Sequence, residues 1–98
     1  MRAVLEHLDT NTIVKPADSV SWSCIDDEAI LLNLNNGFYY TLNEVGCEVW
    51  KLVNEQRTIR EIGIEMCQIY DVDQQQIEQD IWTLFQEMQQ EELIGIVS

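Results

Sequence analysis

The sequence has few basic residues, and this shortage excludes one class of partner. Eighteen Asp and Glu residues outnumber five Lys and Arg residues, which gives a formal net charge of −13. No Lys or Arg follows Arg60, so the nine carboxylates between Glu61 and Ser98 have no basic residue in their segment. Nucleic-acid binding depends on cationic side chains that release counterions from phosphates. A nucleic-acid partner is therefore disfavoured.

Cysteine and histidine are too sparse for a metal centre or a catalytic relay. The cysteines, Cys24, Cys47 and Cys67, are odd in number, widely spaced and without a Cys-x-x-Cys motif. This pattern is typical of buried, reduced thiols rather than of a disulfide framework. His7 is the single histidine, so a zinc site or a histidine-based relay lacks partners. We expect no metal, no cofactor and no catalytic residue.

Long hydrophobic runs are also missing. No run approaches the roughly 20 apolar residues that span a bilayer, and no apolar signal-peptide core begins the chain. The sequence therefore predicts a soluble, cytoplasmic protein. Its 98 residues, 46% of them hydrophobic, fit one domain with a single core. Residues 1–17, with scattered apolar positions and Pro16, predict an N-terminal arm with an edge segment around Thr12 to Val14. Residues 18–98 are the predicted domain.

Apolar runs after this arm predict a three-stranded antiparallel meander. From Ser19 to Ile25 apolar and polar residues alternate, as in a strand with one buried face. The run from Ala29 to Leu34 is apolar on both faces, which indicates the central strand. Asn35-Asn36-Gly37 is a hairpin connection to a last strand from Phe38 to Leu42. This last strand has neither Lys nor Pro, so its free backbone groups are available for pairing.

Three capping patterns predict three helices after the sheet. Asn43 is a helix cap whose side chain accepts from the free N–H groups of the next turn. Thr58 and Glu61 form a capping box, and Asp73 and Gln76 repeat the pattern. The predicted helices span Glu44 to about Asn54, Ile59 to about Tyr70 and Gln74 to about Glu92.

Three strands followed by three amphipathic helices predict an α+β domain of the winged-helix type, closed by a short apolar strand from Leu93 to Val97. Residues at helical spacing give each helix a buried face. The predicted core positions are Val45, Val49, Leu52 and Val53 on the first helix, Ile59, Ile62, Met66 and Ile69 on the second, and Ile77, Ile81, Leu84, Phe85 and Met88 on the third.

Acidic and aromatic residues of the third helix and the last strand are the candidate binding positions. Glu78 and Asp80 fit either a solvated helix face or the side of a groove that attracts a segment carrying Lys or Arg. Trp82 lies off the centre of the buried stripe and either borders such a groove or closes the edge of the core. The aromatic residues of the last strand alternate between its faces, so at least one ring belongs to the core.

One stretch carries a family resemblance. The run from Leu32 to Trp50, LNLNNGFYYTLNEVGCEVW, resembles the signature of the PqqD-like family, named for pyrroloquinoline quinone biosynthesis. The segment from Arg57 to Ile62 and the spacing from Tyr70 to Ile94 are similar as well, so the resemblance covers roughly Val20 to Val97. It implies a small winged-helix recognition element that holds the leader of a ribosomally made, later modified peptide and presents its core to enzymes.

The resemblance also implies where the leader binds and which enzyme receives it. In that family the leader adds as a strand along the third strand of the sheet, in a groove shared with the third helix. The partner enzyme is separate: a lasso-peptide leader protease is favoured over a radical S-adenosylmethionine enzyme. Carried over to this sequence, the leader-binding residues are Phe38, Tyr39, Tyr40, Thr41, Leu42, Ile77, Glu78, Asp80, Ile81, Trp82 and Leu84.

Three other functions are weighed against this one. A winged-helix DNA-binding regulator needs Lys or Arg on the third helix, where the sequence has none. An enzyme needs a convergent polar constellation, which the residues do not suggest. An acidic adaptor or a homo-oligomer formed through the exposed edge strand is the remaining alternative. The favoured interpretation is a non-catalytic peptide chaperone or scaffold that binds a leader by strand addition and needs no cofactor.

Overall fold

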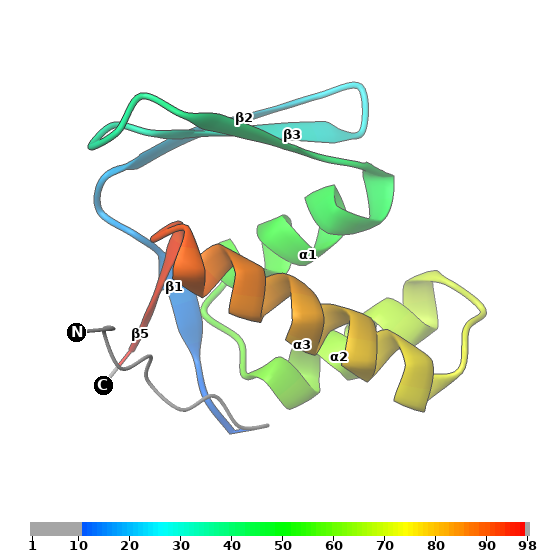
Figure 1. Cartoon of the computed structure of the whole chain (residues 1–98). Helices are drawn as coiled ribbons and strands as arrows, with labels where there is room; N and C mark the ends of the chain where they lie inside the picture. Colours follow the sequence, from blue (N-terminus) through cyan, green and yellow to red (C-terminus); the bar gives the residue numbers. More distant parts are fainter. Residues whose placement is uncertain (1–10, 98) are drawn as a thin grey trace.

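The fold has two main layers, with a three-stranded antiparallel sheet above three helices (Figure 1). The computed structural model describes residues 11–97. The strands of this sheet are β2 (Val20–Ile25), β3 (Glu28–Asn33) and β4 (Tyr39–Leu42). Their order is β2-β3-β4, so β3 is central and β4 lies at an edge. The predicted α+β class and meander are confirmed.

One face of the sheet packs on the helices. In β3, Ala29 and Leu31 are fully buried, and they pair with Leu42 and Tyr40 of β4. Side chains of a strand alternate between its faces, so these four residues point toward the helices. The intervening Ile30 is 41% exposed on the opposite face. The sheet therefore has an inner face against α1 and an outer face that its own helices do not cover.

The last strand begins one residue later than predicted because of a β-bulge. Gly37 has φ +77° and donates its N–H to the carbonyl of Asn33 at 2.8 Å, while the Asn33 N–H donates to the carbonyl of Phe38 at 2.9 Å. Gly37 and Phe38 thus both oppose Asn33. The first position of this bulge, Gly37, requires a positive φ, which glycine adopts at little cost. Phe38 lies in this bulge, outside regular β4, and is 64% exposed. The regular ladder starts at Tyr39.

The three helices begin at the predicted caps. The Asn43 side chain accepts from the N–H of Gly46 at 3.0 Å, and Thr58 and Glu61 form the expected capping box. Asp73 accepts from the N–H of Gln76, but the Gln76 side chain donates to Asp80 rather than completing a second box. The helices are α1 (Glu44–Asn54), α2 (Ile59–Ile69) and α3 (Gln74–Gln90).

The core lies between the sheet and the helices and contains most of the predicted helix positions. Trp50, fully buried on α1, packs edge-on against Trp22 of β2 with ring centroids 6.2 Å apart. Two predicted core residues are wrong, because Val45 is 38% and Ile69 47% exposed. Both lie at helix ends, where the apolar stripe extends beyond the elements that cover its middle. Leu84 is only partly buried.

A second, two-stranded ribbon joins the two ends of the described chain. Strand β1 (Val14–Pro16) pairs antiparallel with β5 (Ile94–Ile96), and Ile13 forms an isolated bridge with Thr58. Val14 is fully buried, so the edge segment that the sequence predicts here contributes to the core. The predicted closing strand is β5. The rest of the predicted arm, residues 1–10 with the single histidine, lies outside the described residues, and the domain boundary at residue 17 stays a prediction.

Candidate functional site

A groove runs between the edge strand β4 and helix α3. One part, of about 430 Å³, is bordered by β4, the start of α1 and the first half of α3, and a second part, of about 350 Å³, continues toward the end of α3. Thr41, Leu42 and Leu84 line both parts, so we name the two together the β4–α3 groove. The first part is lined by Thr41, Leu42, Asn43, Val45, Gly46, Val49, Ile77, Asp80, Ile81 and Leu84, and the second by Leu31, Tyr40, Thr41, Leu42, Leu84, Glu87, Met88, Gln90, Glu91 and Leu93.

Close packing of α1 against β4 forms the floor of this groove. A Cβ atom placed on Gly46 would lie 3.0 Å from the Leu42 Cβ, so a larger residue would press the first turn of α1 against the strand. Ile77 and Ile81, one turn apart on α3, form the opposite wall and are buried. The predominantly apolar lining suits the burial of apolar side chains.

The backbone of β4 presents hydrogen-bonding groups at the sheet edge. Residues of an antiparallel strand direct their N–H and C=O groups alternately toward one neighbour and the other. Phe38 bonds to Asn33 of β3 through its carbonyl, so every second residue after it, Tyr40 and Leu42, also directs its N–H and C=O groups toward β3. The N–H and C=O groups of Tyr39 and Thr41 therefore point to the open edge of β4. An extended peptide placed there would find two donors and two acceptors.

The charged residues among the described lining of the groove are all acidic. Asp80, Glu87 and Glu91 line it, and no Lys or Arg is among its described lining residues. The Tyr40 hydroxyl donates to the Glu91 carboxylate at 2.6 Å, and this hydrogen bond raises the pKa of Tyr40 above its usual value. Tyr40 is therefore neutral at pH 7 and holds Glu91 over the end of the groove. The field in the groove favours a ligand with basic side chains.

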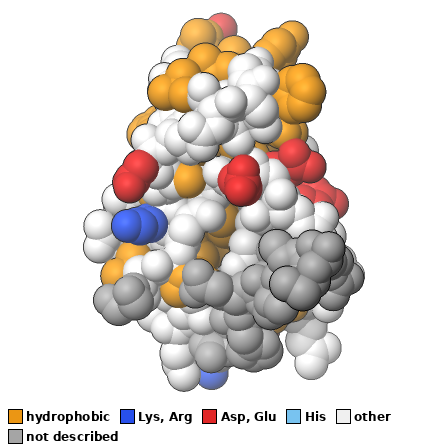
Figure 2. Space-filling model, turned by 60° about the vertical axis from the view of Figure 1, so that its left-hand side comes forward, with side chains coloured by type: hydrophobic (Ala, Val, Ile, Leu, Met, Phe, Trp, Pro, Cys, Tyr) orange, Lys and Arg blue, Asp and Glu red, His pale blue; other side chains and the backbone are white. Residues whose placement is uncertain are grey.

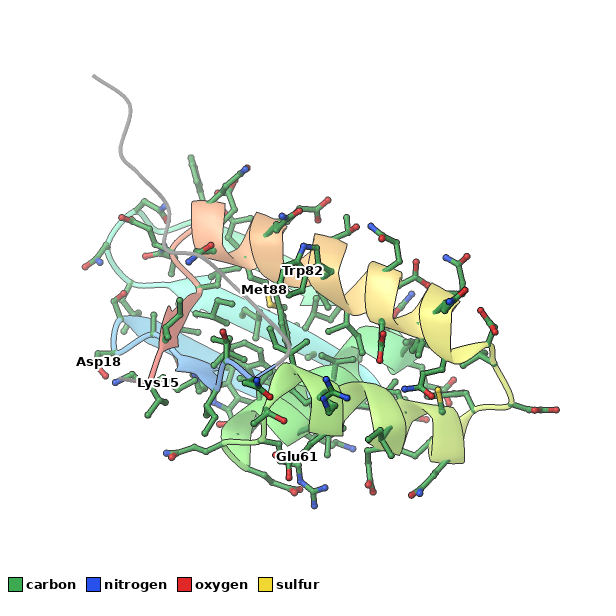
Figure 3. All side chains as sticks on the ribbon, turned by 90° about the horizontal axis from the view of Figure 1, so that it is seen from below. Lys15, Asp18, Glu61, Trp82 and Met88 are labelled. Carbon is green, nitrogen blue, oxygen red and sulfur yellow. The ribbon has the colours of Figure 1, made fainter. Side chains whose placement is uncertain are left out.

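Seven of the predicted site residues line this groove, but two others do not. Glu78 and Trp82 border a separate hollow of about 350 Å³ on the other side of α3, together with Ile59 and Arg60 of α2. Trp82 is seen there in Figure 3, which views the molecule from the side opposite the sheet. Each follows a groove residue in sequence, and one step along an α-helix turns the side chain by about 100°. The seven groove residues are Tyr40, Thr41, Leu42, Ile77, Asp80, Ile81 and Leu84.

The two remaining predicted residues are not among those that line the groove. Tyr39 belongs to β4, but its side chain lies on the outer face of the sheet and is 70% exposed. Phe38 occupies the bulge beside it. Sequence reasoning missed Glu87 and Glu91, although helical spacing from Asp80 places them on the same stripe of α3.

The cysteines lie away from the groove. The Sγ atoms of Cys24 on β2 and Cys47 on α1 are 3.2 Å apart without forming a disulfide. Burial, followed by the hydrogen bond with Cys24, raises the pKa of the Cys47 thiol to about 11. Among residues 11–97 no group of three or more His, Cys, Asp or Glu is placed to hold a metal ion. Over the same residues, no helix has the length and apolarity to cross a membrane.

A known protein family includes most of this chain in its sequence pattern. The family model for coenzyme PQQ synthesis protein D (PqqD) matches residues 28–94, more than half of the chain. The chain belongs to the PqqD family. The match extends from the start of β3 to the start of β5, so the whole β4–α3 groove of this PqqD family member lies within it.

Two solved structures have a similar fold. One, "TbiB1 in Complex with the TbiA(beta) Leader Peptide", is 34% identical in sequence, with a TM-score of 0.80 over 83% of this chain and 94% of that chain. The other, "Lasso peptide synthetase B1 complexed with the leader peptide", is 17% identical, with a TM-score of 0.77 over 84% of this chain and 96% of that chain. The second likeness shows the shared fold. No curated protein matches this PqqD family member.

Proposed function

We propose that this chain binds the leader segment of a ribosomally made precursor peptide and presents it to a separate enzyme. The observation that carries the proposal is the open edge of β4, which runs along an apolar groove. Strand addition uses the main chain for affinity and side-chain pockets for selectivity. Leader binding as such is also supported by TbiB1, a protein 34% identical that is solved in complex with a leader peptide.

The bound leader extends the sheet as a fourth strand next to β4. Its backbone bonds to the N–H and C=O groups of Tyr39 and Thr41. Every second side chain of an extended peptide faces the same way, about 6.8 Å from the next. One set of leader side chains therefore enters the groove beside Leu42 and Leu84, and the other set faces outward.

The chemistry of the groove defines the kind of leader that it selects. A leader that is disordered when free loses conformational entropy on binding, and burial of apolar side chains against Ile81 and Leu84 offsets that loss. Lys or Arg at groove-facing positions of the leader is attracted electrostatically by the carboxylates of Asp80, Glu87 and Glu91. We infer a leader with apolar anchors interleaved with basic residues.

The protein itself is a non-catalytic carrier in this proposal. The chemistry belongs to a partner enzyme that cuts or modifies the precursor while the leader is held. Resemblance of the Gly37 to Trp50 region favours a lasso-peptide leader protease as this partner, followed by a radical S-adenosylmethionine enzyme. The PqqD family membership of the chain agrees with a role beside a biosynthetic enzyme.

A backbone amide NMR titration tests the proposal. The isotope-labelled protein is titrated with synthetic peptides that tile the precursors encoded near its gene, and a scrambled peptide of the same composition is the control. Leader binding shifts the amide signals of Tyr39 to Leu42 and of Ile77 to Leu84. Shifts that map instead to the hollow around Trp82, or no shifts with any tile in the folded protein, would overturn it.

A further inference from the structure

The outer face of the sheet carries an apolar surface that the described helices and strands leave uncovered. Tyr39 is 70% and Leu34 61% exposed, which is unusual for side chains of this size in a small domain. Leu32 pairs with Tyr39 across the strands, and Ile30 and Leu34 stand two positions before and after Leu32 on the same face, so these side chains are neighbours. We name Ile30, Leu32, Leu34 and Tyr39 the outer patch. Figure 2 shows hydrophobic side chains gathered at the upper end of the molecule, where Figure 1 places the sheet.

Acidic residues are the only charged side chains in the segment that builds this face. From Ala17 to Trp50 the chain has six carboxylates and no Lys or Arg. Asp26, Asp27 and Glu28 form the end of the β2–β3 hairpin and are exposed. Two copies joined through this face would bring like charges together, which is unfavourable. A surface with an apolar centre and a rim of Lys and Arg is its complement.

The outer patch is continuous with the edge at which the leader is proposed to bind. Tyr39 and Thr41 turn their side chains to the outer face while their backbone groups face the open edge of β4. A leader added at that edge would place every second side chain on the same outer surface. A protein that covers the outer patch would therefore touch the carrier and the outward side of its leader together.

We propose that the outer patch is the docking surface for the enzyme that acts on the precursor peptide. This inference rests on the proposed function. The enzyme contributes an apolar area rimmed by Lys and Arg, and it binds more tightly when the leader extends the sheet. Because coupling between two ligands is reciprocal, the enzyme raises the affinity of the carrier for the leader by the same factor.

The test compares variants within and outside the outer patch. Ile30→Lys and Leu34→Lys each replace an exposed apolar side chain with a cation that opposes a basic partner. Gln68→Lys on α2 is the matched control, because it makes the same charge change at an exposed position away from the sheet. The probe is the purified enzyme encoded beside the gene of this chain. Its affinity is measured by calorimetry with the leader-free carrier and with the leader-saturated carrier.

We expect each patch variant to weaken enzyme binding about tenfold or more, as loss of an interface anchor does. The variants should keep wild-type circular dichroism and wild-type leader affinity, and Gln68→Lys should match the wild type throughout. Unchanged enzyme affinity in both folded patch variants would overturn the inference, as would an enzyme that binds neither form of the carrier. If the wild type forms dimers and Leu34→Lys makes them dissociate, the outer patch binds a second copy of the chain, and the inference is overturned.

The leader titration separates this inference from the proposed function. Absence of leader binding to the wild type contradicts the proposed function and the coupling between leader and enzyme, whereas the docking surface is tested separately by enzyme binding to the leader-free carrier. Loss of enzyme binding in the patch variants with intact leader binding supports both.

Discussion

Helix α3 borders two hollows that differ in whether the neighbouring backbone has free hydrogen-bonding groups. On one side it faces β4, whose edge carries free N–H and C=O groups, and the groove there is lined by carboxylates. On the other side it faces α2, with Ile59, Arg60 and Trp82 around the hollow. The backbone of α2 is already hydrogen-bonded within its own helix. An extended peptide can therefore extend the structure only on the β4 side.

This difference shows why an apolar hollow alone does not define a peptide site. The hollow on the α2 side, of about 350 Å³, matches one part of the β4–α3 groove in volume, and it even contains part of an indole ring. What distinguishes the β4 side is a row of unpaired main-chain groups beside the apolar wall. Strand addition draws much of its sequence-tolerant affinity from such groups.

The largest expected effect comes from removing one of these main-chain donors. In Thr41→Pro the N–H that points to the open edge is lost, and we expect leader affinity to fall about tenfold to hundredfold, because a leader carbonyl loses its partner. Calorimetric titration of the folded variant measures this. Tyr40→Pro is the contrasting variant: Tyr40 bonds to β3, so we expect it chiefly to lower the thermal stability of the domain. Undiminished leader affinity in folded Thr41→Pro would show that the leader does not bind along the edge of β4.

The next effect compares the two sides of α3 directly. Leu84→Ser should weaken leader binding about tenfold, since Leu84 lines both parts of the β4–α3 groove. Trp82→Ser should leave leader affinity within about twofold of the wild type, because Trp82 lies on the α2 side. Fluorescence anisotropy with a labelled leader measures both, and thermal unfolding checks their stability. A loss of leader affinity with Trp82→Ser as large as with Leu84→Ser would show that the leader contacts both sides of α3.

A smaller effect is expected from the charges of the groove. Glu87→Gln should weaken a basic leader about twofold to fivefold, as is usual for exposed ion pairs, and reduce the dependence of its affinity on salt. Glu78→Gln makes the same change on the α2 side and serves as the control. Affinity is measured at low and high salt for the two variants. Equal effects of both variants would show that the leader responds to net charge rather than to the groove.

The smallest effect concerns the Tyr40–Glu91 hydrogen bond. The bond raises the pKa of Tyr40 above its ordinary value of about 10, so its contribution to stability is present below that pH and is lost as the pH rises through the raised pKa. Glu91→Gln removes the negative charge and should lower the pKa of Tyr40 toward its ordinary value. Ultraviolet titration of tyrosinate, with Tyr40→Phe to assign the transition, measures the shift. An unshifted transition would mean that Tyr40 does not bond to Glu91 in solution.

Much of the fold could be predicted because its signals are local. Asn43, Thr58 and Asp73 start the three helices where the sequence predicts them, since a cap bonds within three residues of itself. Gly37 predicts the hairpin, but the bulge that moves Phe38 out of β4 depends on a bond to Asn33 of the preceding strand. Of the candidate site, the structure places the edge strand beside Ile77 and Ile81, which the family resemblance implies, and their role in leader binding stays a prediction.

Glu78 and Trp82 lie outside the groove for a geometric reason. Helical periodicity shows that Glu78 and Asp80 lie on different faces of α3, but not which face lies beside β4. That depends on how α3 packs on α2 and on the sheet, which brings together residues far apart in sequence, as in the bond from Tyr40 to Glu91. The same holds for the proximity of Cys24 and Cys47, which pairs a strand with a helix.

By itself the sequence determined the order of strands and helices, their caps, the acidic excess and the family signature, because each of these is written in neighbouring residues or in composition. Tertiary structure alone decided that Val14 enters the core through the pairing of β1 with β5, that Glu78 and Trp82 face α2, and that an apolar patch lies exposed on the outer face of the sheet. These features depend on contacts between distant segments, and burial of the shared core selects those contacts for the chain as a whole.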